Sequence, residues 1–402
     1  MSADTRSLAP PATSGPIDWL RKNLFSSWFN AVMTIILLPF VFFAVVAMVR
    51  WVFFTANWRP VTEFPILYLV GQYPRDQLWR PGISLLLLVS MIGLSWGVWE
   101  QFIKPLAVFL AVLLAVLALA PVASPTVTMS IRITFLAASL LIYMGYRIGR
   151  LPAVKGSYIA VFWLVILALV TLVVLPGFEK FSALPKVPTT AWGGLMVTLL
   201  LAIGGIGLSF PIGVLLALGR RSSLPVVKVF SILFIEVVRG VPLITILFMF
   251  SIILALFLPT ESRIDRVIRA LIAMVVFSSA YTAENVRGGL QAVPRGQEEA
   301  AKALGLNNFQ ITFFIVLPQA LRAVIPAIVG QFISLFKDTT LVVIVGINDL
   351  LGIGKSVLNA DPQFIRLQAE VYIFIAAVFW VFSYFMSYAS RQLEKVLGVG
   401  ER

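Results

Sequence analysis

The sequence predicts an all-α membrane protein that crosses the bilayer several times. Hydrophobic residues make up 60% of the 402 residues and charged residues only 12%, about half the share found in a soluble domain. The apolar residues gather in repeated runs close to the roughly 20 residues that span a bilayer. We therefore expect about 8–10 spans.

Ten apolar runs can be drawn along the chain. The fourth and the ninth are the weakest, because Arg132 lies in the fourth and Pro326 interrupts the ninth. Residues 55 to 80 form a long link between the first two runs. The predicted spans are Asn30–Phe54, Ile83–Trp99, Pro105–Ala123, Val127–Tyr146, Tyr158–Leu175, Gly194–Leu218, Phe230–Leu258, Ile264–Tyr281, Ala323–Phe336 and Val371–Tyr388.

The composition excludes several classes of function. The chain has no Cys and no His, which removes thiol chemistry and the commonest acid/base and metal ligand at neutral pH. The net charge is +13, but the basic residues lie mostly at the ends of apolar runs, where they orient and anchor spans in lipid. No basic stripe with interleaved aromatic residues is present, so we expect membrane lipid and no nucleic acid as a partner.

Charge and composition also suggest how the chain is organised. The Pro- and Lys-rich stretch at residues 175–194 separates two groups of apolar runs. We predict a tail at 1–28, a transmembrane extension at 29–185, a main transmembrane domain at 186–397 and a short tail at 398–402. Lys and Arg favour the loops on the side of the N-terminus, which would place both termini in the cytoplasm.

The polar segment between the eighth and ninth runs stands out from its surroundings. Residues 291–304 suit a helix, and Gly305 suits its end, where a left-handed residue is favoured. A second helix is expected to start at "NNFQ", and Pro318 should bend or end it. The segment at about 290–320 is therefore predicted to be a helix, a glycine turn and a second helix, with Ala300 and Ala301 open to a close-fitting protein.

This segment resembles the EAA loop of bacterial ABC-importer permeases. "EAAKALG", nine further residues and "IVLP" reproduce the spacing of that motif. "FIEVVRGVPL", "SSAYTAENVRGGLQAVPRGQ" and "QFISLFKDTTL" are similar to amino-acid permeases, and the likeness covers about residues 189–397. The long N-terminal extension resembles the larger general L-amino acid permeases of the AapM/BztC type. The matching motif positions are Glu299, Ala300, Ala301, Gly305, Ile315, Leu317 and Pro318.

The resemblance implies a fold, a mechanism and a set of partners. The fold would be a type I importer permease core of five spans with the extension added. The EAA loop would dock on a cytoplasmic ABC ATPase dimer, which uses ATP and Mg²⁺, while this chain would bind no cofactor and catalyse no reaction. The other partners would be a second permease, a different chain, and a periplasmic amino-acid-binding protein. The location would be the bacterial inner membrane.

A charged pair lies in the seventh run, in "FIEVVRGVP". Glu236 and Arg239 are three residues apart on one helix and could face each other, and Gly240 with Pro242 should break the span. One interpretation is a gate beside the translocation path, since ionisable residues inside spans are costly and often functional. The other is a neutralised pair that serves helix packing.

Two further stretches have open interpretations. Lys337, Asp338 and Thr339 end the ninth run, and the short apolar run after them could be a re-entrant gate segment or a capped surface turn. "GIGKS" at 352–356 lacks the earlier glycine of a phosphate loop, since Asp349 stands there, so we expect no nucleotide site. Glu284 and Arg287 are expected to cap the eighth span and brace the EAA segment.

The predicted function is therefore the permease subunit of an ATP-driven importer of L-amino acids. An ion-gradient-driven secondary transporter is the main alternative, but it would need a charge relay within the spans, and buried carboxylates are sparse. A membrane enzyme is disfavoured because the chain lacks His, Cys and any carboxylate cluster.

Overall fold

The computed structural model describes residues 15–119, 127–179, 184–257 and 264–398. It divides into two compact units, residues 1–57 and 58–402. The first contains α1 (Pro16–Asn23), α2 (Trp28–Arg50) and the π-helical turn η1 (Trp51–Thr55). α1 therefore lies inside the predicted tail. Ser27 caps α2 by accepting a hydrogen bond from the Asn30 amide, and no residue of α2 is buried.

The second unit is built of helices and short helical turns over its described residues. Its first part contains α3 (Arg59–Thr62), α4 (Pro65–Val70), η2 (Arg75–Gln77), α5 (Trp79–Val98), α6 (Glu100–Leu119), α7 (Met129–Gly149), α8 (Gly156–Leu169), η3 (Val170–Val174) and η4 (Thr189–Ala191). Its second part contains α9 (Gly194–Arg220), α10 (Pro225–Arg239), α11 (Leu243–Phe248), η5 (Met249–Ile253), α12 (Leu254–Phe257), α13 (Arg266–Ala292), α14 (Arg295–Ala303), α15 (Asn308–Gln310), η7 (Ile311–Val316), α16 (Leu317–Asp338), η8 (Thr339–Val345), α17 (Leu350–Ala360), η9 (Phe364–Leu367) and α18 (Gln368–Leu397).

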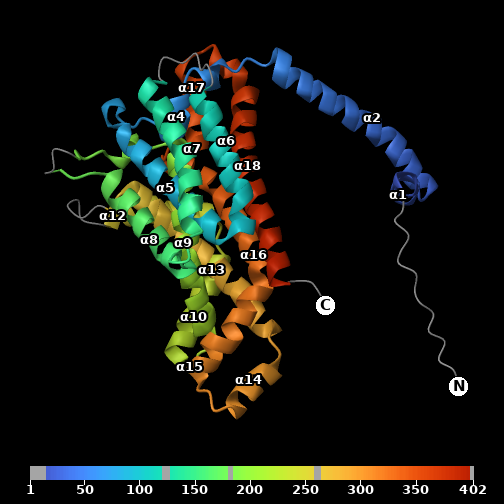
Figure 1. Ribbon diagram of the computed structural model, residues 1–402, viewed down its shortest axis with the longest axis vertical. Coiled ribbons are helices and arrows are strands. Elements are labelled where there is room, and N and C mark those ends of the chain that lie inside the picture. The colour runs from blue at the N-terminus through green and yellow to red at the C-terminus, as the bar shows by residue number, and fades with distance from the viewer. Residues whose placement is uncertain (1–14, 120–126, 180–183, 258–263, 399–402) are drawn as a thin grey trace. The chain divides into compact units, whose positions relative to one another are not determined.

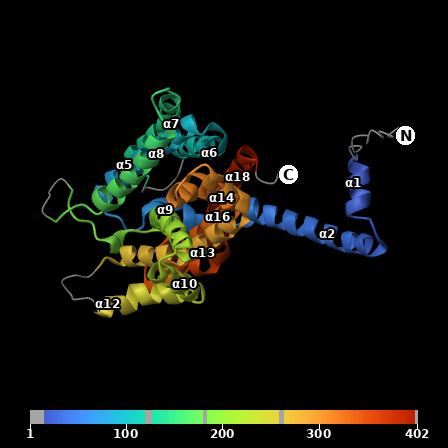
Figure 2. The same cartoon turned by 90° about the horizontal axis from the view of Figure 1, so that it is seen from below.

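Helices α5 to α8 form a bundle on one side of the second unit, and α10 and α12 lie on the other side of α9 and α13 (Figure 2). The closest crossing in the bundle, between α5 and α7, depends on glycines. A Cβ at Gly97 would lie 2.6 Å from the Gly149 Cα, and one at Gly145 would lie 2.7 Å from the Ser90 carbonyl oxygen. Small residues at four-residue spacing allow this approach.

The core of the second part is α13, which packs against α9 and α16 (Figure 1). α9 runs between two ends of the unit. It begins at Gly194, beside Asp349 at the start of α17, and it ends near Glu298 at the start of α14. We call these the α17 end and the α14 end. With 27 residues, α9 is about 40 Å long at 1.5 Å per residue.

The predicted spans correspond to helices, although α18 runs nine residues past the predicted end at Tyr388 and two larger corrections are needed. Eight helices of the described part are long and apolar enough to cross a membrane, the bent pair α10 and α11–α12 would be a ninth, and Ile103–Leu119 is shorter. The end of the third predicted span lies outside the described residues. The link at 55–80 folds into short helices, and Tyr68 of α4 is buried against Phe374 of α18.

Both corrections concern the polar segment. α13 continues eleven residues past the predicted end at Tyr281, and the helix that contains Pro326 begins fifteen residues earlier than predicted, at Asn308. The extra turns of α13 are helical because small side chains pack there: a Cβ at Gly289 would overlap the Ala320 carbonyl oxygen of α16. The connection between the two long helices is therefore only residues 293–307.

Candidate functional site

The α14 segment has the local structure that its sequence predicts. Pro294 precedes a nine-residue helix, which ends where Gly305 adopts φ +78°. The Leu306 amide then bonds the Ala301 carbonyl at 3.2 Å, which closes the helix end. Asn307 starts the next helix with a capping box, in which its side chain and that of Gln310 each accept a bond from the other's amide. The result is a helix, a left-handed glycine and a second helix.

The exposure of the motif residues divides them into two sets. Glu299 and Ala300 are exposed on α14, and Leu304 at its end is 81% exposed. Ala301 is buried in a cluster with Ile311 and Leu317. The prediction that Ala301 is open to a partner is therefore wrong, because this side chain anchors α14 to its own chain. Leu304, which the spacing of the motif does not single out, lies on the exposed side.

Pro318 does not end its helix. The chain passes from α15 through the π-helical η7 into α16, and Pro318 occupies the first turn of α16. The Leu317 amide bonds the Thr312 carbonyl, one residue farther back than in an α-helix. Such a wide turn accommodates the ring and missing N–H of a proline within a helix. Ile315 is half-buried on this turn and Leu317 is buried below it.

An ion pair ties α14 to the end of α9. The Arg221 Nη2 lies 3.0 Å from the Glu298 Oε1, and both side chains are partly exposed. Glu298 stands in the first turn of α14, where a carboxylate also favours the positive end of the helix. α14 is thus held on one side by the buried Ala301 and on another by a partly exposed charge pair.

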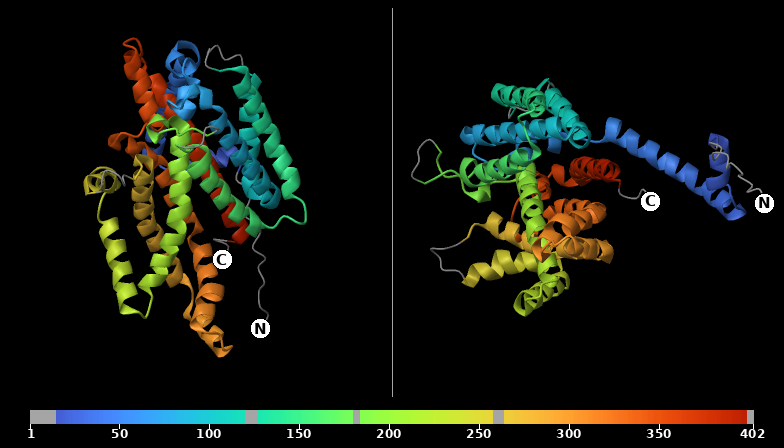
Figure 3. Two further views of the ribbon diagram at one scale, coloured as in Figure 1. Left: turned by 90° about the vertical axis from the view of Figure 1, so that its left-hand side faces the viewer. Right: turned by 60° about the horizontal axis from the view of Figure 1, so that its bottom comes forward.

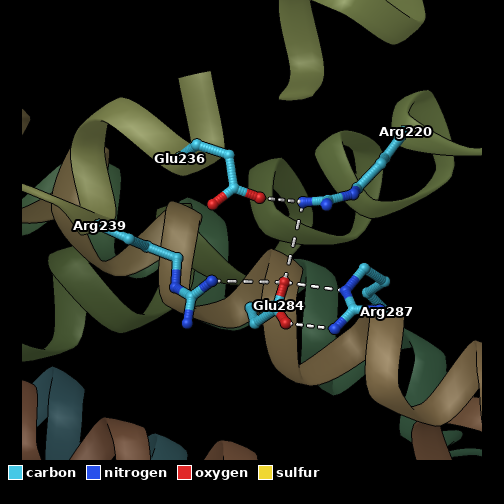
Figure 4. A network of polar contacts seen from close by, with 5 residues as sticks. All are labelled: Arg220, Glu236, Arg239, Glu284 and Arg287. Atoms are coloured by element: carbon cyan, nitrogen blue, oxygen red, sulfur yellow. Dashed lines mark hydrogen bonds and ion pairs between the residues drawn. The ribbon is translucent and has the colours of Figure 1, made fainter. Parts of the chain in front are cut away.

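Five charged residues meet next to this segment, on α9, α10 and α13 (Figure 4). The Arg220 Nη1 lies 2.7 Å from the Glu236 Oε1 and 4.0 Å from the Glu284 Oε2. The Arg239 Nη1 lies 3.5 Å from the Glu284 Oε2, and Arg287 donates two hydrogen bonds to the Glu284 carboxylate. We call Arg220, Glu236, Arg239, Glu284 and Arg287 the charge cluster.

The charge cluster corrects two predictions. Glu236 and Arg239 are not paired with each other, because their partners come from the neighbouring helices α9 and α13. Glu284 and Arg287 do not cap a helix end either, since α13 continues to Ala292 beyond them. The i, i+3 spacing of Glu284 and Arg287 was the local signal for their pairing. The contacts of Arg220 with Glu236 and Glu284 could be found only from the fold.

The break after α10 is where the sequence predicts it. α10 ends at Arg239, Gly240 caps it, and Pro242 precedes α11. α10 and the α11–α12 segment are inclined to each other by 106°, a sharp bend that Figure 3 shows. A proline that cannot donate a backbone hydrogen bond, placed after a glycine, accounts for it.

The second predicted path segment lies against the first. Lys337 is exposed and Asp338 half-buried at the end of α16, while the buried Thr339 donates a 2.7 Å bond to the Phe336 carbonyl and starts η8. η8 packs on α11 in one apolar cluster that contains Leu243, Ile246, Leu335 and Val342. Gly240 and Pro242 therefore lie at the break before α11, and Thr339 lies at the start of η8, which packs on α11. Glu236 and Arg239 lie on α10, the helix before the break.

A buried carboxylate, Asp349, lies at the α17 end. It is fully buried, its Oδ1 accepts the Gly352 amide at 2.8 Å, and its Oδ2 has no hydrogen-bond partner. Burial raises the pKa of the Asp349 carboxyl to about 6, although the Gly352 and Leu351 amides lower it. "GIGKS" lies inside α17, where a Cβ at Gly354 would lie 2.5 Å from the Ile375 side chain of α18. These glycines serve helix packing.

The family follows from comparison with known proteins. Residues 209–398 match the family described as the binding-protein-dependent transport system inner membrane component. The chain belongs to the permeases of amino-acid ABC transporters, because relatives of that class match it almost from end to end. It is a multi-pass inner-membrane protein with a type I permease core and an N-terminal extension.

Two full-length relatives carry this assignment. The chain is 38% identical to the inner membrane amino-acid ABC transporter permease protein YhdY of Escherichia coli K12, over 95% of this chain and 93% of that protein. It is 35% identical to the glutamate/glutamine/aspartate/asparagine transport system permease protein BztC of Rhodobacter capsulatus, over 97% and 95%. The predicted resemblance to the AapM/BztC type is confirmed.

A shorter relative and one solved structure match half of the chain. The probable glutamine ABC transporter permease protein GlnP of Bacillus subtilis is 34% identical over 50% of this chain and 91% of its own length. A crystal structure of an amino acid ABC transporter with histidines is 31% identical, covers 50% of this chain and 91% of that chain, and has a TM-score of 0.45.

Proposed function

We propose that this chain is the membrane-spanning subunit of an ATP-driven importer of L-amino acids and that α14 couples it to a separate ATPase. The observation that carries the proposal is the two-sided character of α14. Its buried side, Ala301, is fixed in the apolar cluster of the α14 end, and its other side presents Glu299, Ala300 and Leu304 to solvent. A short rigid helix with small and apolar exposed residues can fit the groove of another protein and transmit force.

The remaining parts of the proposal follow the family. The α14 end faces the cytoplasm, where a pair of ATPase subunits binds and hydrolyses ATP with Mg²⁺, and this chain binds no nucleotide or metal itself. Both termini are cytoplasmic. A periplasmic amino-acid-binding protein delivers substrate at the α17 end, and a second permease of different sequence completes the path. Residues 29–185 form the extension and residues 186–397 the permease core.

The broken span supplies the movable element in this proposal. Glu236, Arg239, Gly240 and Pro242 lie at the bend between α10 and α11, and η8, which follows Lys337 and Asp338, packs on α11. A change in the angle at Gly240–Pro242 would displace α11 and η8 together, because they share one apolar cluster. These segments are therefore the proposed gate of the translocation path.

The test uses the complex purified through a tag on this chain and placed in proteoliposomes with its binding protein. Uptake of radiolabelled L-glutamate and L-glutamine should require internal ATP and continue when the proton gradient is collapsed. Uptake that persists without ATP while an ion gradient is held would overturn the proposal in favour of a secondary transporter.

A variant tests the role of α14 itself. Leu304→Asp should lower uptake at least tenfold, because a carboxylate in a protein–protein groove loses its water without a partner. Ile17→Asp is the matched control, since Ile17 is 80% exposed and lies outside the coupling segment, and it should leave uptake unchanged. Equal uptake by both variants would exclude Leu304 from the ATPase contact.

A further inference from the structure

Glu284 is the point where three helices of the α14 end are joined. Arg220 comes from α9, Arg239 from α10 and Arg287 from α13 itself, and all three guanidinium groups have a nitrogen within 4.0 Å of the Glu284 carboxylate. Figure 4 shows Glu284 between them. Its side chain is 23% exposed, so these contacts are partly shielded from water and salt.

The three guanidinium groups depend on Glu284 to different degrees. Arg220 also has Glu236 at 2.7 Å. For Arg239, Glu284 supplies the only carboxylate within 4.0 Å among the described residues, and the Arg239 Nε is buried without a hydrogen-bond partner. Arg239 also contacts the face of the Tyr281 ring on α13, 5.7 Å away. Arg239 is thus held to α13 by one carboxylate and one aromatic ring.

The position of Glu284 connects two elements that the proposed function needs. Glu284 stands eight residues, about 12 Å, before the end of α13 at Ala292, and α14 starts three residues after that end. Across the bundle Glu284 holds Arg239, the last residue of α10 before the bend at Gly240–Pro242. A displacement of α14 carried along α13 can reach the bend through Glu284 and Arg239, in parallel with the apolar packing of α10 on α13.

We infer that Glu284 is the positioning residue that links α14 to the α10–α11 bend and so couples ATP use to movement of the gate. The inference rests on the proposed function. The cluster holds three guanidinium groups and two carboxylates, so loss of the Glu284 charge removes the anion from Arg239 and leaves α10 held to α13 by apolar packing and the Tyr281 ring. Movement of the coupling helix is then transmitted to the bend less strongly.

The test is Glu284→Gln in the complete complex in proteoliposomes, with uptake of L-glutamate or L-glutamine and ATP hydrolysis measured on the same preparation. We expect hydrolysis within about twofold of the unchanged protein and a roughly tenfold fall in amino acid taken up per ATP. Glu284→Asp, which keeps the charge, should recover a large part of that ratio. Glu179→Gln is the control, because Glu179 forms a highly exposed pair with Lys186, and it should leave the ratio unchanged.

Three further outcomes decide the inference. Arg239→Gln combined with Glu284→Gln should couple no worse than Glu284→Gln alone, because the two side chains act as one contact. Uptake and hydrolysis that fall in proportion, or an unchanged ratio, would overturn the inference and leave Glu284 a purely structural residue. If the unmodified complex takes up amino acid without ATP, the proposed function fails first, and that result is read before any variant.

Discussion

The two ends of α9 hold their polar groups in different ways. At the α17 end two buried polar side chains bond the backbone: Arg80 Nη2 donates to the Pro185 carbonyl at 2.8 Å and Tyr73 Oη to the Leu175 carbonyl at 2.7 Å. Arg80 is fully buried and Tyr73 only 3% exposed. At the α14 end charged side chains pair with one another and stay partly exposed. The first arrangement fixes one conformation, while the second can exchange partners at small cost.

The reason lies in what each bond requires. A buried group that loses its partner costs about 1–3 kcal/mol, or more if charged, so the α17 end resists any rearrangement. A half-exposed ion pair contributes about 1 kcal/mol or less, so it can break and form again with water as a substitute. The polar contacts of the α17 end are therefore costly to break, and those of the α14 end cost little to exchange.

Two left-handed glycines give the largest expected difference between the ends. Gly194 has φ +63° and a Cβ there would overlap the Tyr68 carbonyl oxygen, whereas Gly305 has φ +78° with nothing within 4 Å of a Cβ. Gly194→Val should lower the free energy of unfolding by about 2–5 kcal/mol, from strain plus overlap. Gly305→Val should lower it by about 1–2 kcal/mol, from strain alone.

Thermal unfolding of the purified chain in detergent measures both effects. Gly207→Ala is the control, because Gly207 is helical with open space around it, and it should gain about 0.5–1 kcal/mol. If Gly305→Val destabilises the chain as much as Gly194→Val, the two ends are equally rigid and the comparison fails.

The next effect depends on pH at the α17 end. Because the pKa of Asp349 is raised to about 6 in the folded chain and is about 3.9 when unfolded, the folded state holds the proton more tightly. The stabilisation from this group is complete below pH 4 and is lost as pH rises through 6, up to about 3 kcal/mol in all. Asp349→Asn, which is neutral throughout, should remove that part of the pH dependence.

Unfolding temperatures of the unmodified chain and of Asp349→Asn, compared at about pH 5 and about pH 8, check this prediction. The unmodified chain should lose more stability on the rise in pH than the variant does. Parallel pH profiles for the two proteins would mean that Asp349 stays ionised in its buried position.

The smallest effect is expected at the α14 end. Arg221→Gln removes a pair whose side chains are 45% and 33% exposed, so unfolding should become easier by only about 0.2–1 kcal/mol, and high salt should abolish the difference. Arg266→Gln serves as the control, because Arg266 donates to the neutral Gly346 carbonyl and its loss should not depend on salt. A salt-independent loss at Arg221 would contradict a screened contact.

Local signals predicted much of the fold and part of the site. Gly305, the "NNFQ" start and the break at Gly240–Pro242 were correctly predicted because each depends on backbone conformation or on missing hydrogen bonds within a few residues. The apolar runs located the helices for the same reason, since hydrophobicity over about 20 residues is itself local.

Partners from distant segments were not predictable in the same way. Glu236 pairs with Arg220 across α9 and α10, and nothing in its own helix indicates this. The length of α13 was underestimated because its polar residues looked like a membrane boundary. Thr282, just beyond the predicted end at Tyr281, is in fact buried, as are Ala283 and Val286.

The contact of α4 with the start of α9 has a consequence for any attempt to trim this protein. Tyr68 belongs to the chain before residue 186, yet it fills a space among Leu350, Ile353 and Val371, and a Cβ on the neighbouring Gly71 would lie 2.5 Å from the Gly193 backbone. A shortened chain that starts at residue 186 would therefore expose the apolar side chains that Tyr68 covers. The segment at residues 58 to 78 completes the core of the half of the unit that follows, so removing it should destabilise that half.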